Sequence, residues 1–147
     1  MVANERYFTV SEANALVPKL EGLLERLSEL YEEVAALFSE FSSQGVPPRE
    51  EEGSPDDPED VKQKRAQLRD LAAELQEGIN DVNAMGCILK DVESGLVDFL
   101  SRRAGRTVHL CWRRGEPEVS WWHDLESGYQ GRRPISTADE FEGSYLH

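Results

Sequence analysis

Four side chains able to bind a metal or to catalyse a reaction lie in one C-terminal stretch of the 147-residue chain: Asp98, His109, Cys111 and His123. Imidazole, thiolate and carboxylate groups are the ligands that zinc takes from proteins. A zinc site would use the two imidazoles and the thiolate, with Asp124 or Glu116 as the fourth ligand. A thiol enzyme would instead use the cysteine as a nucleophile, with the histidine and the aspartate activating it.

Strand register decides whether these groups can meet. His109 and Cys111 are two residues apart, so they share one face of a strand. His123 belongs to the following strand, and a slip of one residue in the pairing would move it to the opposite face. Pro117 has no amide hydrogen and fits a turn better than a ladder, so we expect a four-residue loop at residues 114–117.

This loop pairs apolar residues across the two strands, Leu110 with Trp121 and Trp112 with Val119. His123 then lies on the apolar face, at the rim of the core and away from Cys111. The expected register therefore predicts no metal site. It also places Trp122 on the opposite face, exposed to solvent.

The preceding hairpin has an equally regular pattern. With Ala104-Gly105 as its turn, Phe99 faces Leu110 and Asp98 faces Cys111. A Cys–His–Asp group could form on the polar face. Small polar residues on a solvent-facing sheet explain the same pattern, with a thiol that is partly buried and unreactive.

An exposed tryptophan among charged side chains is typical of a surface that binds a partner. Two arginines after Gly131 could hold a carboxylate or phosphate, or could pair with the acidic helices. We therefore expect a non-enzymatic interaction or scaffold protein that binds an unknown protein or a small anionic ligand, without a cofactor. The alternative is a small metal-dependent or thiol enzyme built on the four residues named first. The residues expected to bind are Asp98, Cys111, Arg113, Glu116, Trp122, His123, Arg132 and Arg133.

The N-terminal half predicts the frame that carries this segment. Thr9 and Glu12 have the spacing of a capping box, which predicts the start of a long helix. Its apolar residues follow a 3.5-residue period, typical of a coiled-coil seam. A second row repeats every seven residues beside the first: Val17, Leu24, Tyr31 and Phe38. The apolar face is thus too wide for one partner helix.

An acidic, proline-rich connector at residues 43–57 separates this helix from a second one. Asp57 as N-cap and Pro58 at the first helical position predict where the second helix begins. Two long helices with such a connector suggest an antiparallel hairpin. Gly22 would then lie opposite Gly78, leaving a notch for a tryptophan; two unrelated exposed glycines explain them equally well.

The expected fold is α+β in a single domain, residues 1–147. A long, coiled-coil-like antiparallel helical hairpin spans residues 9–86, and a small three-stranded antiparallel β-meander with a Gly/Arg-rich segment spans residues 87–135. The strands are expected at residues 97–101, 106–113 and 118–123. Residues 136–147 are expected to form a loosely held tail. Because this sheet cannot cover both helices, we expect a homodimer through the helices.

Composition excludes several classes of protein. The net charge of −13 opposes binding to nucleic acid or to an anionic membrane, although seven arginines fall within residues 99–134. No apolar run approaches the length of a membrane span, and the N-terminus lacks the apolar core of a signal peptide. Two cysteines without a spaced framework favour a reducing compartment. The sequence therefore predicts a cytoplasmic, acidic protein.

Several different short motifs are spread along most of the chain. Phe8-Thr9 is followed by Glu12-Ala13-Asn14, and later by Gly95-Leu96-Val97-Asp98-Phe99 and Gly105-Arg106. Leu110-Cys111-Trp112, Gly115-Glu116, Trp122-His123 and Gly128 to Arg132 complete the set. With these motifs the chain resembles a family of small prokaryotic proteins known only as a domain of unknown function, number 2203. Tyr129 departs from the phenylalanine that the family favours. The resemblance implies no established activity and transfers no catalytic residue.

Overall fold

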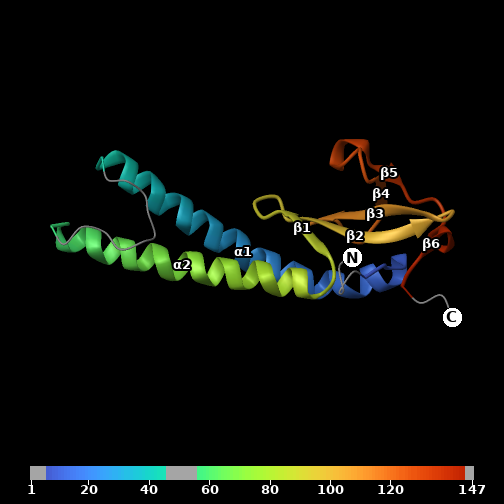
Figure 1. Cartoon of the computed structure of the whole chain (residues 1–147), viewed down its shortest axis with the longest axis horizontal. Coiled ribbons are helices and arrows are strands. Elements are labelled where there is room, and N and C mark those ends of the chain that lie inside the picture. Colours follow the sequence, from blue (N-terminus) through green and yellow to red (C-terminus); the bar gives the residue numbers. More distant parts are fainter. Residues whose placement is uncertain (1–5, 46–55, 145–147) are drawn as a thin grey trace.

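The computed structural model describes residues 6–45 and 56–144 and shows two helices followed by an antiparallel sheet, an α+β arrangement (Figure 1). The predicted connector falls largely outside the described residues, as do the last three residues of the predicted tail. The elements are α1 (Val10–Ser43), α2 (Glu59–Ala84), β1 (Ile88–Asp91), β2 (Leu96–Arg103), β3 (Arg106–Arg113), β4 (Trp121–Asp124), the 3-10 turn η1 (Tyr129–Gly131), β5 (Arg133–Pro134), the 3-10 turn η2 (Ala138–Glu140) and β6 (Phe141–Glu142).

The predicted start of α1 is confirmed, because Thr9 and Glu12 form a reciprocal capping box. The predicted cap of α2 is wrong. Pro58 is the N-cap and makes no side-chain cap hydrogen bond, whereas Asp57 forms an ion pair with Arg65 at 3.1 Å. The Asp57 carboxylate therefore pairs with a side chain about two helical turns further along the chain.

The sheet has six strands, not the three expected. Strands β1 to β5 are neighbours in chain order, and β6 pairs with the end of β2. The strands that the sequence pattern missed are four residues long at most, too short for an alternating pattern to be visible. The C-terminal segment is not loose as far as the structure describes it, because Phe141 is buried and Ser144 donates its amide hydrogen to the Tyr7 carbonyl.

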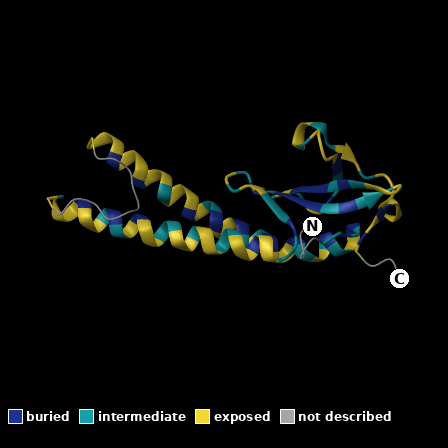
Figure 2. Ribbon diagram, in the orientation of Figure 1, coloured by how far each residue is buried: buried dark blue, intermediate teal, exposed yellow. Residues whose placement is uncertain are grey.

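One face of the sheet packs on the N-terminal half of α1 and forms the main core (Figure 2). Its side chains alternate along the strands as the hairpin pattern predicted, with Phe99 paired to Leu110 and Val97 paired to Trp112. We call this the apolar face. It consists of Val97, Phe99, Val108, Leu110, Trp112 and Trp122.

The helices α1 and α2 lie side by side and extend well past the sheet (Figure 1). Ion pairs join the two helices at two levels, Arg26 with Glu74 at 2.9 Å and Lys64 with Glu40 at 3.4 Å. A Cβ at Gly78 would collide with the Leu27 side chain, which marks a close approach of the helices. The expected partner of Gly78 is wrong, since Gly22 faces open space. None of the described helices is long and apolar enough to cross a membrane.

Candidate metal centre

The pairing of β3 with β4 differs by one residue from the expected register. His109 pairs with His123, Leu110 with Trp122 and Cys111 with Trp121. His123 therefore shares a face with His109 and Cys111, and the prediction that separated them is wrong. The prediction for the β2–β3 hairpin is confirmed, with Asp98 opposite Cys111.

The physical reason for this register is an irregular entry into β4. Val119 donates its amide hydrogen to the side-chain oxygen of Asn14 on α1, at 2.7 Å, instead of to a ladder partner. Val119 and Trp122 are three residues apart and both join the core, which a regular strand does not allow. The connection before β4 is therefore one residue longer than expected. This shift of one residue places each β4 side chain on the face opposite to the expected one.

Asp98, Cys111 and His123 converge on the sheet face opposite α1. One ligand atom from each lies within 4.8 Å of the other two. The three residues are 2%, 0% and 2% exposed, so each is almost completely removed from water. They come from the three central strands β2, β3 and β4, which fix their spacing. We call this group, together with His109, the polar cluster.

Asp98 lies at the middle of the polar cluster. His123 Nε2 lies 3.2 Å from each carboxylate oxygen, while His123 Nδ1 lies 2.7 Å from the Asp124 carbonyl oxygen. His109 Nδ1 lies 3.6 Å from Asp98 Oδ2, beyond hydrogen-bond distance. This buried nitrogen has no hydrogen-bond partner among the described residues. The imidazole rings of the two histidines are 5.0 Å apart, edge to face.

Burial and the shared carboxylate change the acid–base behaviour of the cluster. Burial raises the pKa of Cys111 to about 12, and the charge of Asp98 acts in the same direction. Burial also lowers the pKa of His109, although the nearby carboxylate opposes this shift. For His123 burial favours the neutral ring, but the hydrogen bonds to Asp98 and to the Asp124 carbonyl outweigh it and raise the pKa.

These properties favour one of the two possible roles of the cluster, metal binding, over the other, catalysis by a thiol nucleophile. A thiol with a pKa near 12 is protonated at neutral pH and is therefore a poor nucleophile. A bound metal ion removes the thiol proton and satisfies the carboxylate and imidazole at the same time. The residue types, a carboxylate, a thiol and two imidazoles, are those that bind zinc and its neighbours in the periodic table.

Arg132 lies beside the polar cluster and is held on three sides. Its guanidinium lies over the rings of Trp121 and Tyr129 and donates a hydrogen bond to Glu116 at 2.7 Å. Its positive charge reaches Cys111 and partly opposes the upward shift of the thiol pKa. The two expected binding residues Arg132 and Glu116 thus pair with each other next to the cluster.

Trp122 lies on the apolar face and is buried, so the prediction of an exposed indole is wrong. Its ring packs edge to face with Phe141. The guanidinium groups of Arg103 and Arg133 lie over it at 4.6 and 5.0 Å. Trp121 takes the polar-face position instead and is half-buried, which reverses the expected roles of the two indoles.

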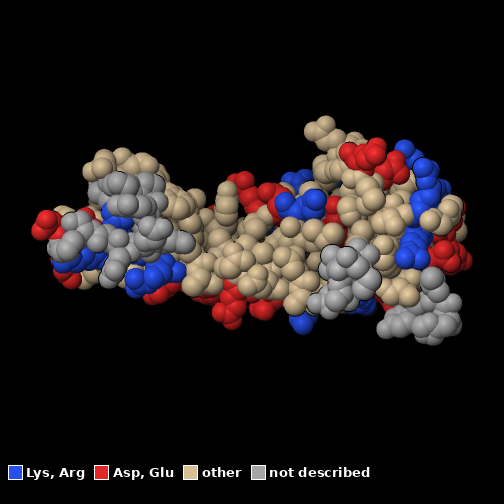
Figure 3. Space-filling model, in the orientation of Figure 1, with Lys and Arg blue, Asp and Glu red and all other residues tan. Residues whose placement is uncertain are grey.

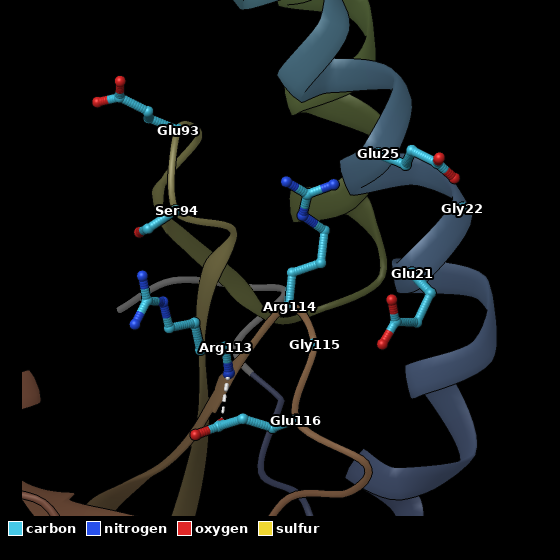
Figure 4. Close-up of a pocket in the computed structure, with 9 residues that line it drawn as sticks. All are labelled: Glu21, Gly22, Glu25, Glu93, Ser94, Arg113, Arg114, Gly115 and Glu116. Atoms are coloured by element: carbon cyan, nitrogen blue, oxygen red, sulfur yellow. Dashed lines mark hydrogen bonds between the residues drawn. The ribbon is translucent and has the colours of Figure 1, made fainter.

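Arg113 lies apart from the cluster and lines a cleft of about 640 Å³ between α1, the β1–β2 turn and the β3–β4 connection. Figure 4 shows Arg114 extending towards α1 across this cleft, with Glu21 and Glu25 on the helix and Glu93 on the far side. Glu116 also lines the cleft and accepts a hydrogen bond from the Arg113 amide at 2.8 Å (Figure 4). The lining carries both signs of charge and has no net preference for an anion.

Basic side chains gather at the sheet end of the molecule, but acidic side chains lie among them (Figure 3). Two ion pairs illustrate this mixture, Arg103 with Glu140 at 3.2 Å and Arg133 with Asp124 at 3.5 Å. The arginines counted in the sequence therefore do not form a field of one sign on this surface.

Sequence reasoning named Asp98, Cys111 and His123 as candidates but missed that they meet. It also did not predict that Tyr129 contacts the Arg132 guanidinium, or that Asn14 binds the Val119 amide just before β4. The spacing of Val119 and Trp122 could have revealed the irregular strand, because both are large apolar residues three positions apart.

The comparisons with known proteins give a family but no relative of established activity. A family model described as an uncharacterized conserved protein matches residues 6–135, which confirms the resemblance noted in the sequence. No curated protein and no solved structure matches the chain. The chain belongs to the family DUF2203, for which no activity is established.

Proposed function

We propose that this protein binds one divalent transition-metal ion, zinc by preference, through Asp98, Cys111 and His123, with His109 as the fourth ligand. The observation that carries the proposal is the convergence of three buried ligand atoms within 4.8 Å of one another. The unpartnered Nδ1 of His109 beside the same carboxylate is the second support. This proposal replaces the expectation of a chain without a metal.

The spacing of the cluster suits a tetrahedral ion. Ligand atoms about 2.0–2.3 Å from zinc at the corners of a tetrahedron are about 3.3–3.8 Å apart. His123 Nε2 and His109 Nδ1 lie 3.2 and 3.6 Å from Asp98 Oδ2. His109 lies outside the group of three ligand atoms within 4.8 Å, so its ring would have to move towards Cys111 and His123 to complete the coordination. The two histidine nitrogens that would face the metal both lie beside the Asp98 carboxylate. The other ring nitrogen of His123, Nδ1, already contacts the Asp124 carbonyl, and a contact of this kind fixes the orientation of a histidine ring in a metal site.

The burial of the ligands favours a structural role over a catalytic one. A catalytic zinc keeps one position open to water and substrate, whereas a structural zinc is closed by four protein ligands. Here Asp98, Cys111 and His123 are each no more than 2% exposed. An ion at this position would link side chains of β2, β3 and β4, in addition to the backbone ladders that already pair these strands.

The interaction or scaffold role expected from the sequence has lost its main support. It depended on an exposed Trp122, and this indole lies in the core. Arg132 already pairs with Glu116 and lies against two aromatic rings, and its buried Nε is left without a hydrogen-bond partner among the described residues. The thiol-enzyme alternative is weakened by the raised pKa of Cys111.

Metal analysis of the untagged protein tests the proposal. We expect about one zinc per chain after purification without chelator, and one cobalt per chain after exchange. Cobalt bound to a thiolate gives a charge-transfer band in the near ultraviolet, which reports the ligand directly. Cys111→Ser should remove this band and release the metal.

Cys87→Ser is the matched control, because Cys87 is also buried and reduced but its thiol donates to the Val82 carbonyl. This variant should keep the metal and the cobalt band. Circular dichroism of the metal-free variants shows whether each one folds. The proposal fails if the wild-type protein takes up no cobalt or zinc, or if both serine variants lose the band equally.

A further inference from the structure

The second apolar row of α1 is covered along only half of its length. Val17 and Leu24 are 7% and 0% exposed because they lie under the sheet. Tyr31 and Phe38, the next two residues of the same seven-residue row, are 38% and 41% exposed. Figure 2 shows exposed positions along both helices where they extend past the sheet. Arg114, which follows β3, donates a hydrogen bond to Ser28 at 3.5 Å, whereas among the described residues Tyr31 and Phe38 further along α1 stay exposed.

The uncovered part of the row carries no charge. Tyr31, Ala35, Phe38 and Ser42 follow one another at steps of four, three and four residues. This is the spacing of a coiled-coil seam, and small residues between two aromatic rings let another helix approach closely. We call these four residues the bare stripe. Two exposed aromatic rings on one row of a helix are a feature of interaction surfaces.

Charges beside the bare stripe indicate what covers it. Between residues 27 and 43, α1 carries Glu29, Glu32, Glu33 and Glu40 and no basic side chain. Between residues 61 and 69, α2 carries the opposite set, Lys62, Lys64, Arg65 and Arg69, and no acidic side chain. Within the chain these two sets meet in the ion pair Lys64–Glu40. Glu32, Glu33, Lys62 and Arg69 all remain exposed.

A second copy of the chain fits this arrangement. A two-fold axis across the bare stripes would place the acidic side of each α1 beside the basic side of the other α2, so that every charge contact occurs twice. The connector at residues 46–55 is a poor alternative, because it has three consecutive glutamates and one aliphatic side chain, Val46. A stripe flanked by glutamates would repel it.

We infer that two copies associate through the ends of α1 and α2 that project past the sheet, with the bare stripes in the centre of an antiparallel four-helix bundle. The occupant of the stripe is a second copy of this chain. The inference is independent of the metal, since Asp98 and its neighbours lie on the sheet.

Sedimentation velocity of the full chain tests the inference. We expect a dimer across the micromolar range. Tyr31→Glu with Phe38→Glu should raise the dimer dissociation constant by on the order of 100-fold or more, because two aromatic contacts on each copy are lost. Both positions are exposed, so circular dichroism should be unchanged. Leu125→Glu, a charge placed on an exposed apolar residue of the sheet end, is the matched control and should leave the dimer intact.

A charge exchange distinguishes this bundle from other dimers. Glu32→Lys with Glu33→Lys should weaken the dimer, and adding Lys62→Glu with Arg69→Glu should restore it. A wild-type chain that stays monomeric at high micromolar concentration would overturn the inference. So would a dimer that survives the two aromatic substitutions, or one that the second pair of charge changes fails to restore.

Discussion

The two faces of the sheet contain opposite kinds of side chain, although β2, β3 and β4 contribute to both. On the apolar face Phe99 and Leu110 are completely buried against α1. On the other face Asp98, Cys111 and His123 are buried just as deeply. Burying apolar groups stabilises the fold, whereas burying ionisable groups costs free energy unless each is paired. One face therefore accounts for the stability of the sheet, and the other points to a ligand.

The polar face is only partly satisfied by its own hydrogen bonds. His123 reaches Asp98 with one nitrogen and the Asp124 carbonyl with the other, whereas His109 Nδ1 lacks a partner among the described residues. A buried group without a partner costs roughly 1–3 kcal/mol. Natural sequences accept such a cost mainly where the group has a function. This difference between the faces can be measured.

The largest effect is expected from the apolar face. Leu110→Ala should lower the free energy of unfolding by about 2–5 kcal/mol, since it removes a fully buried side chain and leaves a cavity. The bound metal per folded molecule should not change, because Leu110 points away from the polar cluster. Denaturant unfolding and metal analysis of the same sample measure both quantities.

Leu125→Ala is the control for this substitution, since Leu125 is 55% exposed. It should change the free energy of unfolding by no more than about 0.5 kcal/mol. If Leu110→Ala lost its metal while it remained folded, the two faces would not be independent and the comparison would be wrong.

A smaller effect is expected from the polar face, and it should depend on the metal. Asp98→Asn keeps the shape of the side chain but removes its charge. In the presence of chelator we expect a loss of about 1–3 kcal/mol, because a buried hydrogen-bond acceptor of His123 is weakened. With zinc present the difference from the wild-type protein should grow, since a bound ion stabilises only the chain that binds it.

Asp124→Asn is the matched control, because the Asp124 side chain is exposed and contacts His123 only through its carbonyl. Its stability should not respond to the removal of zinc any differently from that of the wild-type protein. An equal zinc response in Asp98→Asn and the wild-type protein would mean that Asp98 is a structural partner of His123 and not a ligand.

The same contrast explains what the sequence could predict. Alternation along β2 and β3 predicted the pairs Phe99–Leu110 and Asp98–Cys111, because a tight turn at Ala104-Gly105 fixes the register locally. The β3–β4 connection has no such constraint. Its register depends on the contact of Val119 with Asn14, which is 105 residues away in the sequence. A pattern within one segment cannot report a contact with another.

The one-residue shift in the β3–β4 register brings the candidate site together. A regular strand would have placed His123 in the core and Trp122 outside, as the sequence predicted. The extra residue moved His123 to Cys111 and Trp122 to the core. The sequence therefore identified Asp98, Cys111 and His123 as candidate ligands, but it did not predict that they lie close together. Strands of two residues, such as β5 and β6, could not be predicted either, because two residues are too few to show an alternating pattern.

The smallest effect is expected at the edge of the apolar face, where Trp122 meets solvent-facing arginines. Arg103 lies 4.6 Å from the Trp122 ring and 3.2 Å from Glu140. Arg103→Gln should lower the free energy of unfolding by about 0.5–1 kcal/mol, the usual size of an exposed cation–π contact. Arg106→Gln, at an exposed position of the same hairpin, should have less effect, and unfolding at high salt separates the ring contact from the ion pair.

If Trp122 were a partner-binding indole, as an exposed position would suggest, removing Arg103 would free its ring and leave stability unchanged. Its fluorescence would then move to longer wavelength and become accessible to a soluble quencher. In the arrangement described here, Phe141 and Arg133 still cover the ring after the substitution. The emission should therefore keep its position, because the indole belongs to the face that holds the sheet on α1 and takes no part in the polar cluster.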